Sequence, residues 1–318
     1  MAEMLKVFNL TLNNVGMLLI FISVGYILRR SHKLPDDAGK VMSLLCVMVF
    51  SPAYSILNLS KNVRIDKMAE NLQLLGYGLG FAVVAVVTGL ILGKAMGKSP
   101  MDKSSLTYAF TFPNYGYFGY PVIEGVFGKE GLGDFMVFAI PMSILCCSYG
   151  YVLFQKDKKI NLLRLLKTPV IAAMFIGIAL GLSGLALPEN NIVYKTLDGA
   201  GKCMSPCSML LAGFMLGKFP LKKLFSGIRP YYLTAIRMLG IPVAFGAVMY
   251  LCGLRGNLLF WPLVFACLPL GLNLVVYAES SGFEKEAGDN AKLCFISYVL
   301  ALVVLPCLFA VMTRIAGM

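Results

Sequence analysis

The chain has 318 residues, of which 58% are hydrophobic and 14% are charged, and its mean hydropathy is +0.77. A soluble globular protein carries roughly 25% charged residues, so this composition excludes a soluble protein and indicates an integral membrane protein. The formal net charge of +12 would suit a nucleic-acid partner. However, the basic residues lie in alternate loops between apolar segments, so we interpret the charge as a topology signal and expect no nucleic-acid binding.

Ten apolar segments follow one another along the chain, each long enough to cross a hydrocarbon core of roughly 30 Å. No long polar stretch separates them, so we predict an all-α membrane bundle without a sizeable soluble domain. The first segment has Glu3 where a signal peptide would be basic, and no cleavage site follows it, so we expect it to be retained. The predicted spans are 8–28, 40–59, 72–95, 104–127, 133–154, 167–187, 197–216, 231–252, 258–278 and 291–313.

Lysine and arginine are concentrated in every second loop, as in the segment 155–167 and around Arg29 and Lys218. Positive residues accumulate on the cytoplasmic side of a membrane protein. We therefore predict a multi-pass protein of the plasma (cytoplasmic) membrane with both termini outside.

Cysteine and histidine offer little support for a metal site. Most of the nine cysteines fall inside predicted spans, where a thiol packs as a small apolar group. Cys203 and Cys207 are four residues apart, which suits either a metal pair or packing on one helical face. Because His32 is the only histidine and no second thiol pair lies nearby, packing is favoured. We predict neither a metal nor a cofactor.

The basic segment 155–167 divides the chain into two halves of five spans each, 1–157 and 158–318. An odd number of crossings in each half means that an internal repeat must be inverted, as is common in secondary transporters. Weak internal similarity supports the repeat, because SPAYSILNL at 51–59 and SPCSMLLAG at 205–213 occupy corresponding places. We predict two inverted five-helix repeats in one membrane domain.

Proline and glycine interrupt the fourth and ninth predicted spans. Proline removes a backbone donor and glycine tolerates unwound dihedral angles, so backbone groups are freed at membrane depth. Such groups are tolerated only where protein or water satisfies them, so we expect two unwound segments that line a cavity. The alternative is that both residue types are simply common in membrane helices. The interrupting residues are Pro113, Gly116, Gly119 and Pro121 in the fourth span, and Pro269 and Gly271 in the ninth.

A second half-helix is expected to begin at each break, with its N-terminus near the bilayer midplane. Helix N-termini present unpaired N–H groups and a partial positive charge, so two of them together favour an anion such as a carboxylate. Asn114 and Asn273 would add amide donors without a buried charge. Tyr115, Tyr117 and Tyr120 either line the same cavity or belong to an interfacial belt.

Other side chains in the spans have competing interpretations. Arg237 would contact a carboxylate substrate, cap the carbonyls of a broken helix, or form a structural ion pair. Glu124 would carry a coupled proton or lie at the outer interface. Phe260 and Trp261 fit an aromatic belt.

These features resemble the auxin efflux carrier family, within the bile acid/arsenite/riboflavin transporter superfamily, over essentially the whole chain. Pro113-Asn114 followed by Gly119 and Pro121 is similar to the family's fourth-span pattern, and PLGLN at 269–273 is similar to its ninth-span pattern. Pro206, Arg237 and Pro242 also stand where family members carry them.

The resemblance implies crossed broken helices in a mobile transport domain of spans 3–5 and 8–10, beside a scaffold of spans 1, 2, 6 and 7. It implies elevator-type alternating access, with Asn114, Pro121 and Pro269 at the carboxylate of the substrate. Plant members have a second proline where this chain has Asn273, and a longer central loop. The chain therefore looks like bacterial members, for which malonate and malate are the usual inferred substrates. An apolar scaffold face is compatible with a homodimer.

The sequence thus predicts a secondary transporter of a small organic anion, a mono- or dicarboxylate, and not an enzyme. A cation/proton antiporter is an alternative, although no aspartate falls in 104–127 or 258–278. A channel and a sensor built on a transporter fold stay open, whereas an intramembrane enzyme lacks a nucleophile–base or metal set. The predicted substrate-binding residues are Asn114, Gly119, Pro121, Pro269, Gly271, Asn273 and Arg237, and Glu124 is the predicted proton-coupling residue.

Overall fold

The structure is a computed structural model that describes residues 2–155, 165–185 and 187–316. These residues form helices and turns, and the extended pairing within them is one isolated antiparallel bridge between Pro113 and Leu270. The prediction of an all-α fold is therefore confirmed. The predicted boundary between the two halves, at 157/158, lies outside the described residues, as do the basic residues Lys156, Lys158, Lys159 and Arg164.

Within the described residues, six helical stretches are long and apolar enough to cross a membrane, and two apolar helices are shorter. The prediction of a multi-pass membrane protein is confirmed, whereas the count of ten crossings stays a prediction. The six long stretches are Ala2–Arg30, Ala38–Asn62, Ile65–Met96, Tyr115–Gly150, Arg229–Leu251 and Glu284–Ile315, and the two shorter helices are Pro169–Ser183 and Asn257–Cys267.

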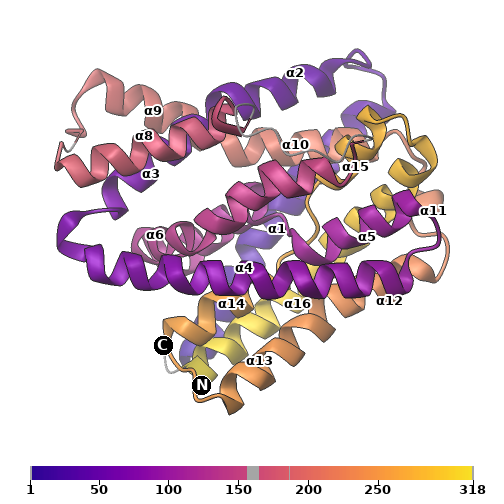
Figure 1. Cartoon of the computed structure of the whole chain (residues 1–318). Helices are drawn as coiled ribbons and strands as arrows, with labels where there is room; N and C mark the ends of the chain where they lie inside the picture. The colour runs from indigo at the N-terminus through magenta and orange to yellow at the C-terminus, as the bar shows by residue number, and fades with distance from the viewer. Residues whose placement is uncertain (1, 156–164, 186, 317–318) are drawn as a thin grey trace.

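Figure 1 shows the elements in chain order. They are α1 (Ala2–Arg30), α2 (Ala38–Leu45), η1 (Cys46–Phe50), α3 (Ser51–Asn62), η2 (Ile65–Lys67), α4 (Met68–Met96), α5 (Pro100–Thr111), η3 (Tyr115–Gly119), α6 (Tyr120–Leu145), η4 (Cys146–Gly150), α8 (Pro169–Ser183), α9 (Ile192–Lys202), α10 (Met204–Leu216), α11 (Leu221–Leu224), α12 (Arg229–Ala235), η5 (Ile236–Gly240), α13 (Ile241–Leu251), α14 (Asn257–Cys267), α15 (Asn273–Ser280) and α16 (Glu284–Ala316).

Two predicted spans are divided at their proline- and glycine-containing segments, and the fourth and fifth spans are joined in one helix. The fourth span is split between α5 and η3–α6, and the ninth between α14 and α15. The second part of the fourth span continues into the fifth through α6, which is kinked at Gly128. Gly128 has φ 72°, a backbone conformation that favours glycine. The expected breaks at both proline-containing segments are therefore present.

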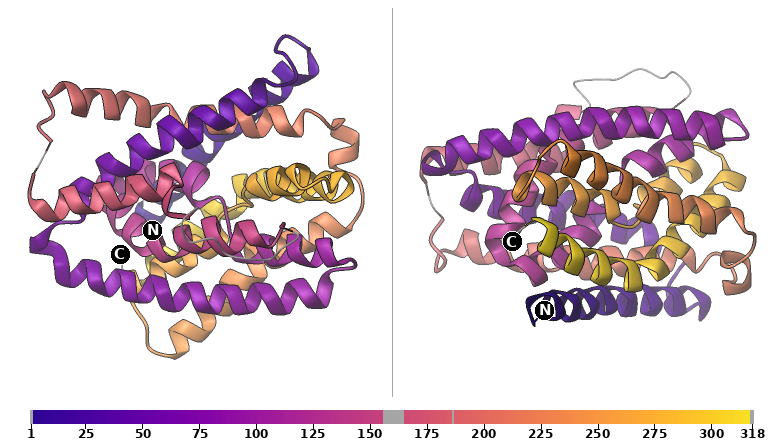
Figure 2. Two further views of the ribbon diagram at one scale, coloured as in Figure 1. Left: turned by 45° about the horizontal axis from the view of Figure 1, so that its top comes forward. Right: turned by 90° about the horizontal axis from the view of Figure 1, so that it is seen from below.

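Close helix packing holds the bundle together. The helix α1 packs along α10, and a Cβ atom at Gly25 or Gly213 would collide with the backbone carbonyl of the facing helix. Small residues of this kind let membrane helices approach closely. Elsewhere α3 packs on α8, α4 on α5 and α6, and α16 on α1, α12 and α15. In the right-hand view of Figure 2, α1 and α4 flank the bundle on opposite faces.

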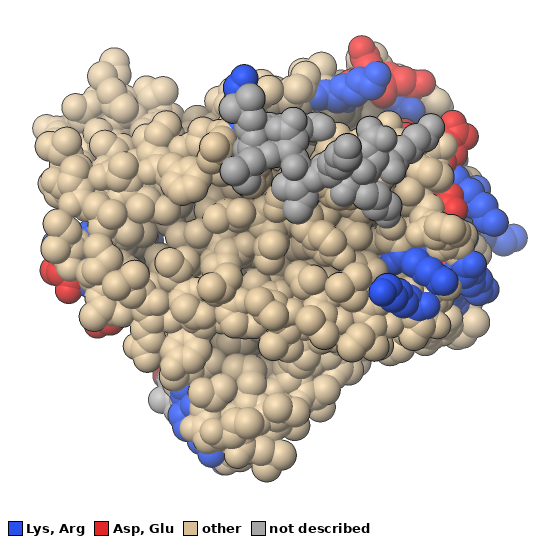
Figure 3. All heavy atoms as spheres, viewed as in Figure 1, with Lys and Arg blue, Asp and Glu red and all other residues tan. Residues whose placement is uncertain are grey.

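The charged side chains mark the two ends of the bundle. Figure 3 shows a broad, mostly uncharged surface, with lysine and arginine most numerous at the right-hand edge, beside acidic side chains, and a few more at the lower tip. We call this edge the basic end; it carries the turns that follow Arg30, Met96, Leu216 and Ser280. The two termini lie close together away from that edge (Figure 1), at what we call the opposite end.

The aromatic-belt interpretation of Phe260 and Trp261 is wrong. Both side chains are buried, and Trp261 is 1% exposed. Their helix, α14, lies within the bundle, where the two rings make edge contacts with Phe127. Their amphipathic character is compatible with an interface, but packing against α6 determines their position.

Candidate substrate site

The two breaks meet inside the bundle and run antiparallel to each other. The backbone N–H of Asn114 donates to the carbonyl of Pro269 over 2.7 Å, and Pro113 pairs with Leu270 in the isolated bridge. Pro113 and Pro269 have no N–H to donate, so each interrupts the hydrogen bonding of its own helix. Backbone groups beside them then pair across the crossing instead. Two segments that are far apart in the sequence therefore form one structural unit.

The helix α16 provides hydrogen-bond partners for polar groups that are not paired within the crossing. The Leu270 N–H donates to Ser297 Oγ over 3.0 Å. The side-chain amide of Asn114 donates to the hydroxyl of Tyr298 over 3.1 Å, and the asparagine is only 5% exposed. Buried backbone groups require such partners, so α16 fixes both the backbone and the Asn114 side chain.

Arg237 lies behind the crossing and caps two helices. Its guanidinium donates from Nε to the carbonyl of Ala109 over 3.0 Å and from Nη1 to the carbonyl of Ala266. These carbonyls belong to the last turns of α5 and α14, where the helix dipole is negative. Arg237 is 2% exposed. Its contacts match the carbonyl-cap interpretation, and a contact with substrate stays a prediction.

A cavity of about 360 Å³ lies against the crossing. We call it the crossing cavity. Its described lining residues include hydroxyl and thiol groups but no charged side chain. Any electrostatic preference for an anion must therefore come from amides, hydroxyls and helix ends. The lining residues include Pro113, Asn114, Gly116, Gly271 and Asn273 from the breaks, Tyr108, Tyr115, Tyr117, Tyr120, Tyr151 and Tyr277, and Ser43, Ser51, Ser55, Ser143, Cys146, Cys147 and Thr168.

The structure brings some of the predicted site residues together and places others away from the cavity. Asn114, Gly271 and Asn273 line it. Pro269 contributes its carbonyl to the crossing. Gly119 packs against the side chain of Leu268, where a Cβ atom would approach Leu268 Cδ1 to 2.7 Å.

Three other predicted residues are not among the residues given above as lining the cavity. Pro121 lies in the first turn of α6, and Arg237 caps the half-helices. Glu124 accepts a hydrogen bond from Tyr54 over 3.2 Å and faces a separate pocket at the opposite end. Proton coupling at Glu124 is not tested by this geometry and stays a prediction.

Sequence reasoning missed much of the cavity wall. Tyr115, Tyr117 and Tyr120 line the cavity as one of the two interpretations expected. The contributions of α2–α3 and α8 were not predicted, because serine at 43, 51 and 55 is an ordinary residue in a membrane helix. Ser51 and Ser55 are four residues apart and therefore lie on one face of α3, and this spacing was the sequence feature that could have indicated a polar wall.

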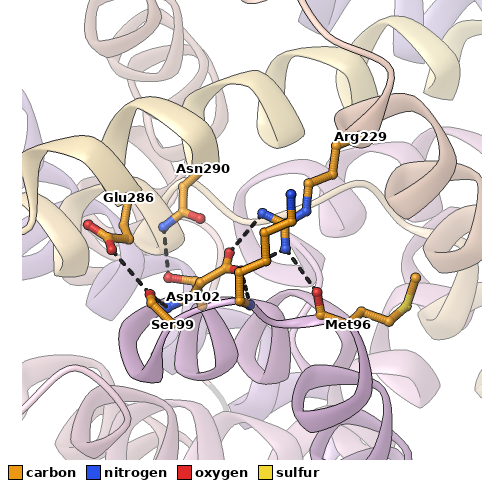
Figure 4. Close-up of polar contacts among 8 residues, drawn as sticks. Met96, Ser99, Asp102, Arg229, Glu286 and Asn290 are labelled. Atoms are coloured by element: carbon orange, nitrogen blue, oxygen red, sulfur yellow. Dashed lines mark hydrogen bonds and ion pairs between the residues drawn. The ribbon is translucent and has the colours of Figure 1, made fainter.

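A polar cluster ties the half-helices together at the basic end (Figure 4). Arg229 on α12 donates to both carboxylate oxygens of Asp102 on α5, over 3.2 and 2.6 Å, and to the carbonyl of Met96 over 3.0 Å. Ser99 accepts from the Asp102 N–H as the N-cap of α5 and donates to Glu286 on α16. This cluster joins elements from both halves of the chain.

One buried amide extends that connection toward the crossing. Asn290 on α16 donates to Ser105 on α5 over 3.2 Å and to the carbonyl of Leu274 on α15 over 3.0 Å. The first part of one broken helix and the second part of the other therefore share a partner. This shared hydrogen-bond donor connects α5, α15 and α16.

The membrane helices, the crossed breaks and the cavity between them together define a polytopic membrane transport protein. A family model described as "Membrane transport protein" matches residues 11–309. This chain belongs to that family, and the resemblance to auxin efflux carriers is thereby confirmed.

Two relatives match nearly the full chain, and both are described as uncharacterized transporters. The protein from Methanocaldococcus jannaschii is 25% identical over 301 residues, which cover 92% of this chain and 95% of that protein. The protein from Methanothermobacter thermautotrophicus is 23% identical over 299 residues, covering 91% and 94% respectively. The family and both relatives indicate a transporter and not an enzyme.

Proposed function

We propose that this protein is a secondary transporter that carries a small organic anion, a mono- or dicarboxylate, through the crossing cavity. The observation that supports this most directly is the position of Asn114 at the antiparallel crossing, where it also lines the cavity. A carboxylate there would meet amide groups and the N-terminal end of α15, which stabilise negative charge. The described lining has no carboxylate of the kind that a cation/proton antiporter uses.

The size and chemistry of the cavity limit the substrate class. Small-molecule sites have volumes of roughly 300–1,000 Å³, so a cavity of about 360 Å³ suits a small substrate. Hydroxyl groups along the wall would hydrogen-bond a second oxygen-bearing group. Malonate and malate, which the family resemblance implies, fit both requirements.

The transport mechanism that we propose is elevator-type alternating access. The mobile unit would contain α4–α6 and α12–α16, in which the cluster around Asp102 and Asn290 joins both halves. The scaffold would contain α1, α2–α3, α8 and α9–α10. The basic end would face the cytoplasm and both termini the outside, in the plasma membrane. Glu124 is the candidate for proton coupling.

Uptake into liposomes tests the proposed function. Purified protein would be reconstituted and supplied with labelled malonate, malate, succinate or the monocarboxylate propionate, with and without a pH gradient. Asn114→Ala should lower uptake by about tenfold or more, because a hydrogen bond to a charged group contributes roughly 1.5–3 kcal/mol. Asn14→Ala is the matched control, since the Asn14 amide bonds within its own helix, to Leu10.

The possible results separate the parts of the proposal. Saturable uptake that Asn114→Ala abolishes and Asn14→Ala retains would support the carboxylate site. A dependence on the pH gradient would show proton coupling, which Glu124→Gln should remove if Glu124 carries the proton. Absence of uptake for every carboxylate, in both gradient directions and with folded protein, would contradict the proposed substrate class.

A further inference from the structure

A second pocket lies at the opposite end of the bundle, close to the crossing cavity. It has a volume of about 450 Å³, and we call it the opposite pocket. In contrast to the crossing cavity, it is lined by many charged side chains. Its lining includes Lys61, Lys129, Lys195, Lys202, Glu124, Glu130, Glu189 and Asp198, together with Tyr54 and Tyr194.

Two stacked tyrosines lie between these spaces. Tyr54 lines the opposite pocket and Tyr120 lines the crossing cavity. Their ring centroids are 5.8 Å apart and their planes differ by 12°. The ring pair therefore lies between a pocket lined by charged side chains and a cavity whose described lining is uncharged.

A hydrogen bond from Tyr54 to Glu124 stabilises this ring pair. The Tyr54 hydroxyl donates to Glu124 Oε2 over 3.2 Å, and Glu124 follows Tyr120 by one turn of α6. Tyr54 lies on α3, which belongs to the proposed scaffold, whereas both of its partners lie on the proposed mobile unit. Movement of one unit along the other must break both contacts at once.

We propose that Tyr54, Tyr120 and Glu124 form a gate between the opposite pocket and the crossing cavity, and that the gate is closed in this structure. The gate rests on the proposed transport function, because it controls entry of the anion to the crossing. The four lysines and four carboxylates that line the opposite pocket balance in formal charge, so this entrance is polar but carries no net charge that would hold an anion there. Two of these lysines form ion pairs, Lys61 with Glu189 and Lys202 with Asp198.

Native cysteines provide a test that needs no substrate. Cys147 lines the crossing cavity, whereas Cys252 is exposed just after α13, at the opposite end. A charged, membrane-impermeant methanethiosulfonate would be added to the opposite-end side of oriented proteoliposomes. Peptide mass spectrometry would then give the modification rate of each cysteine, with Cys252 as the internal control for reagent delivery.

The variants distinguish the ring contact from the hydrogen bond. Tyr54→Ala removes both and should raise the modification rate of Cys147 by about tenfold relative to Cys252. Tyr54→Phe and Glu124→Leu keep the rings but remove the hydrogen bond, and should give smaller increases. Tyr194→Phe is the matched control, because Tyr194 lines the same pocket but bonds to Lys61 and Glu189. It should leave the rate unchanged.

Two labelling results would contradict the proposed gate. One is rapid modification of Cys147 in the wild-type protein from the opposite end. Another is a rate in folded Tyr54→Ala that stays within about twofold of wild type, less than the loss of one hydrogen bond would produce. If carboxylate uptake occurs with either result, transport stands and the gate fails. If labelling changes as expected without uptake, the gate stands and the substrate class fails.

Discussion

Arg237 and Ala266 are joined by a hydrogen bond from the buried guanidinium to the last turn of α14, and the same side chain also reaches Ala109 at the end of α5. One cation thus serves the C-terminal ends of both half-helices that precede the crossing. The guanidinium has a fixed fork of donors that can reach two acceptors. The two helix ends at the crossing are therefore stabilised by Arg237, a residue that belongs to neither break.

Replacement of Arg237 by leucine should destabilise the protein by about 3 kcal/mol, because two buried carbonyls lose their donor. Arg237→Lys should be intermediate, since one ammonium does not reproduce the fork. Thermal unfolding in detergent would measure both. Arg255→Leu is the control, because Arg255 is exposed and bonds to carbonyls of its own segment.

The same variants separate a cap from a substrate contact. If Arg237 acts only as a cap, the folded fraction of Arg237→Lys should keep the wild-type KM for its anion. An increase of about tenfold in KM with unchanged stability would instead indicate a direct charge-assisted contact with substrate.

The pair formed by Asp102 and Arg229 should contribute a measurable coupling energy. The two side chains are 15% and 23% exposed and share two hydrogen bonds. We expect about 1–2 kcal/mol from a double-mutant cycle of Asp102→Asn and Arg229→Met, read from thermal stability. The cycle for Asp289 and Lys292 is the control; that pair is within one helix, and its carboxylate is 47% exposed. It should give less than about 0.5 kcal/mol, and an equal value for both pairs would contradict a special role of the cluster.

Close approach of α1 and α10 predicts a large difference between two glycines of one helix. Gly25→Ala should cost about 2 kcal/mol or more, because its Cβ would meet the backbone of Leu210. Gly16→Ala should be neutral or stabilising by up to about 1 kcal/mol, because that position is open and alanine favours helix. Melting temperatures of the two variants would decide. Equal destabilisation would mean that helix propensity, and not packing, sets the effect.

The sequence predicted the membrane class and the positions of the breaks well, because both depend on local chemistry. Apolar runs must cross lipid, and Pro113 and Pro269 cannot continue a ladder of helical hydrogen bonds. Periodicity and loop charge do not depend on which helices become neighbours. These parts of the fold were therefore accessible without a structure.

Features that depend on which helices are neighbours were less accessible. Nothing local indicates that Arg237 would reach Ala109 and Ala266, or that Tyr298 would hold Asn114. Trp261 was misplaced for the same reason: an amphipathic ring suits an interface or a core, and only the packing of α14 decides. Glu124 accepts a hydrogen bond from Tyr54 on α3, and no spacing in the sequence indicates this contact.

A carboxylate introduced at Asn273 should oppose the proposed substrate. Asn273 begins α15 and lines the crossing cavity. Asn273→Asp would place a negative charge at the anion site at pH 7, because an aspartate has an unperturbed pKa of roughly 3.9. We expect carboxylate uptake to fall by about tenfold or more, since like charges at close range in a poorly solvated site repel strongly.

The pH dependence of this variant provides the check. Protonation removes the introduced charge, so uptake by Asn273→Asp should recover relative to wild type only as the pH approaches the aspartate pKa, from about pH 5 to about pH 4. Asn273→Ser is the matched control, because it keeps a hydroxyl donor without a charge and should retain uptake within a few-fold. If Asn273→Asp and Asn273→Ser transported carboxylates equally at pH 7, the anion would not bind at the N-terminus of α15. The site would then have to lie elsewhere along the cavity wall.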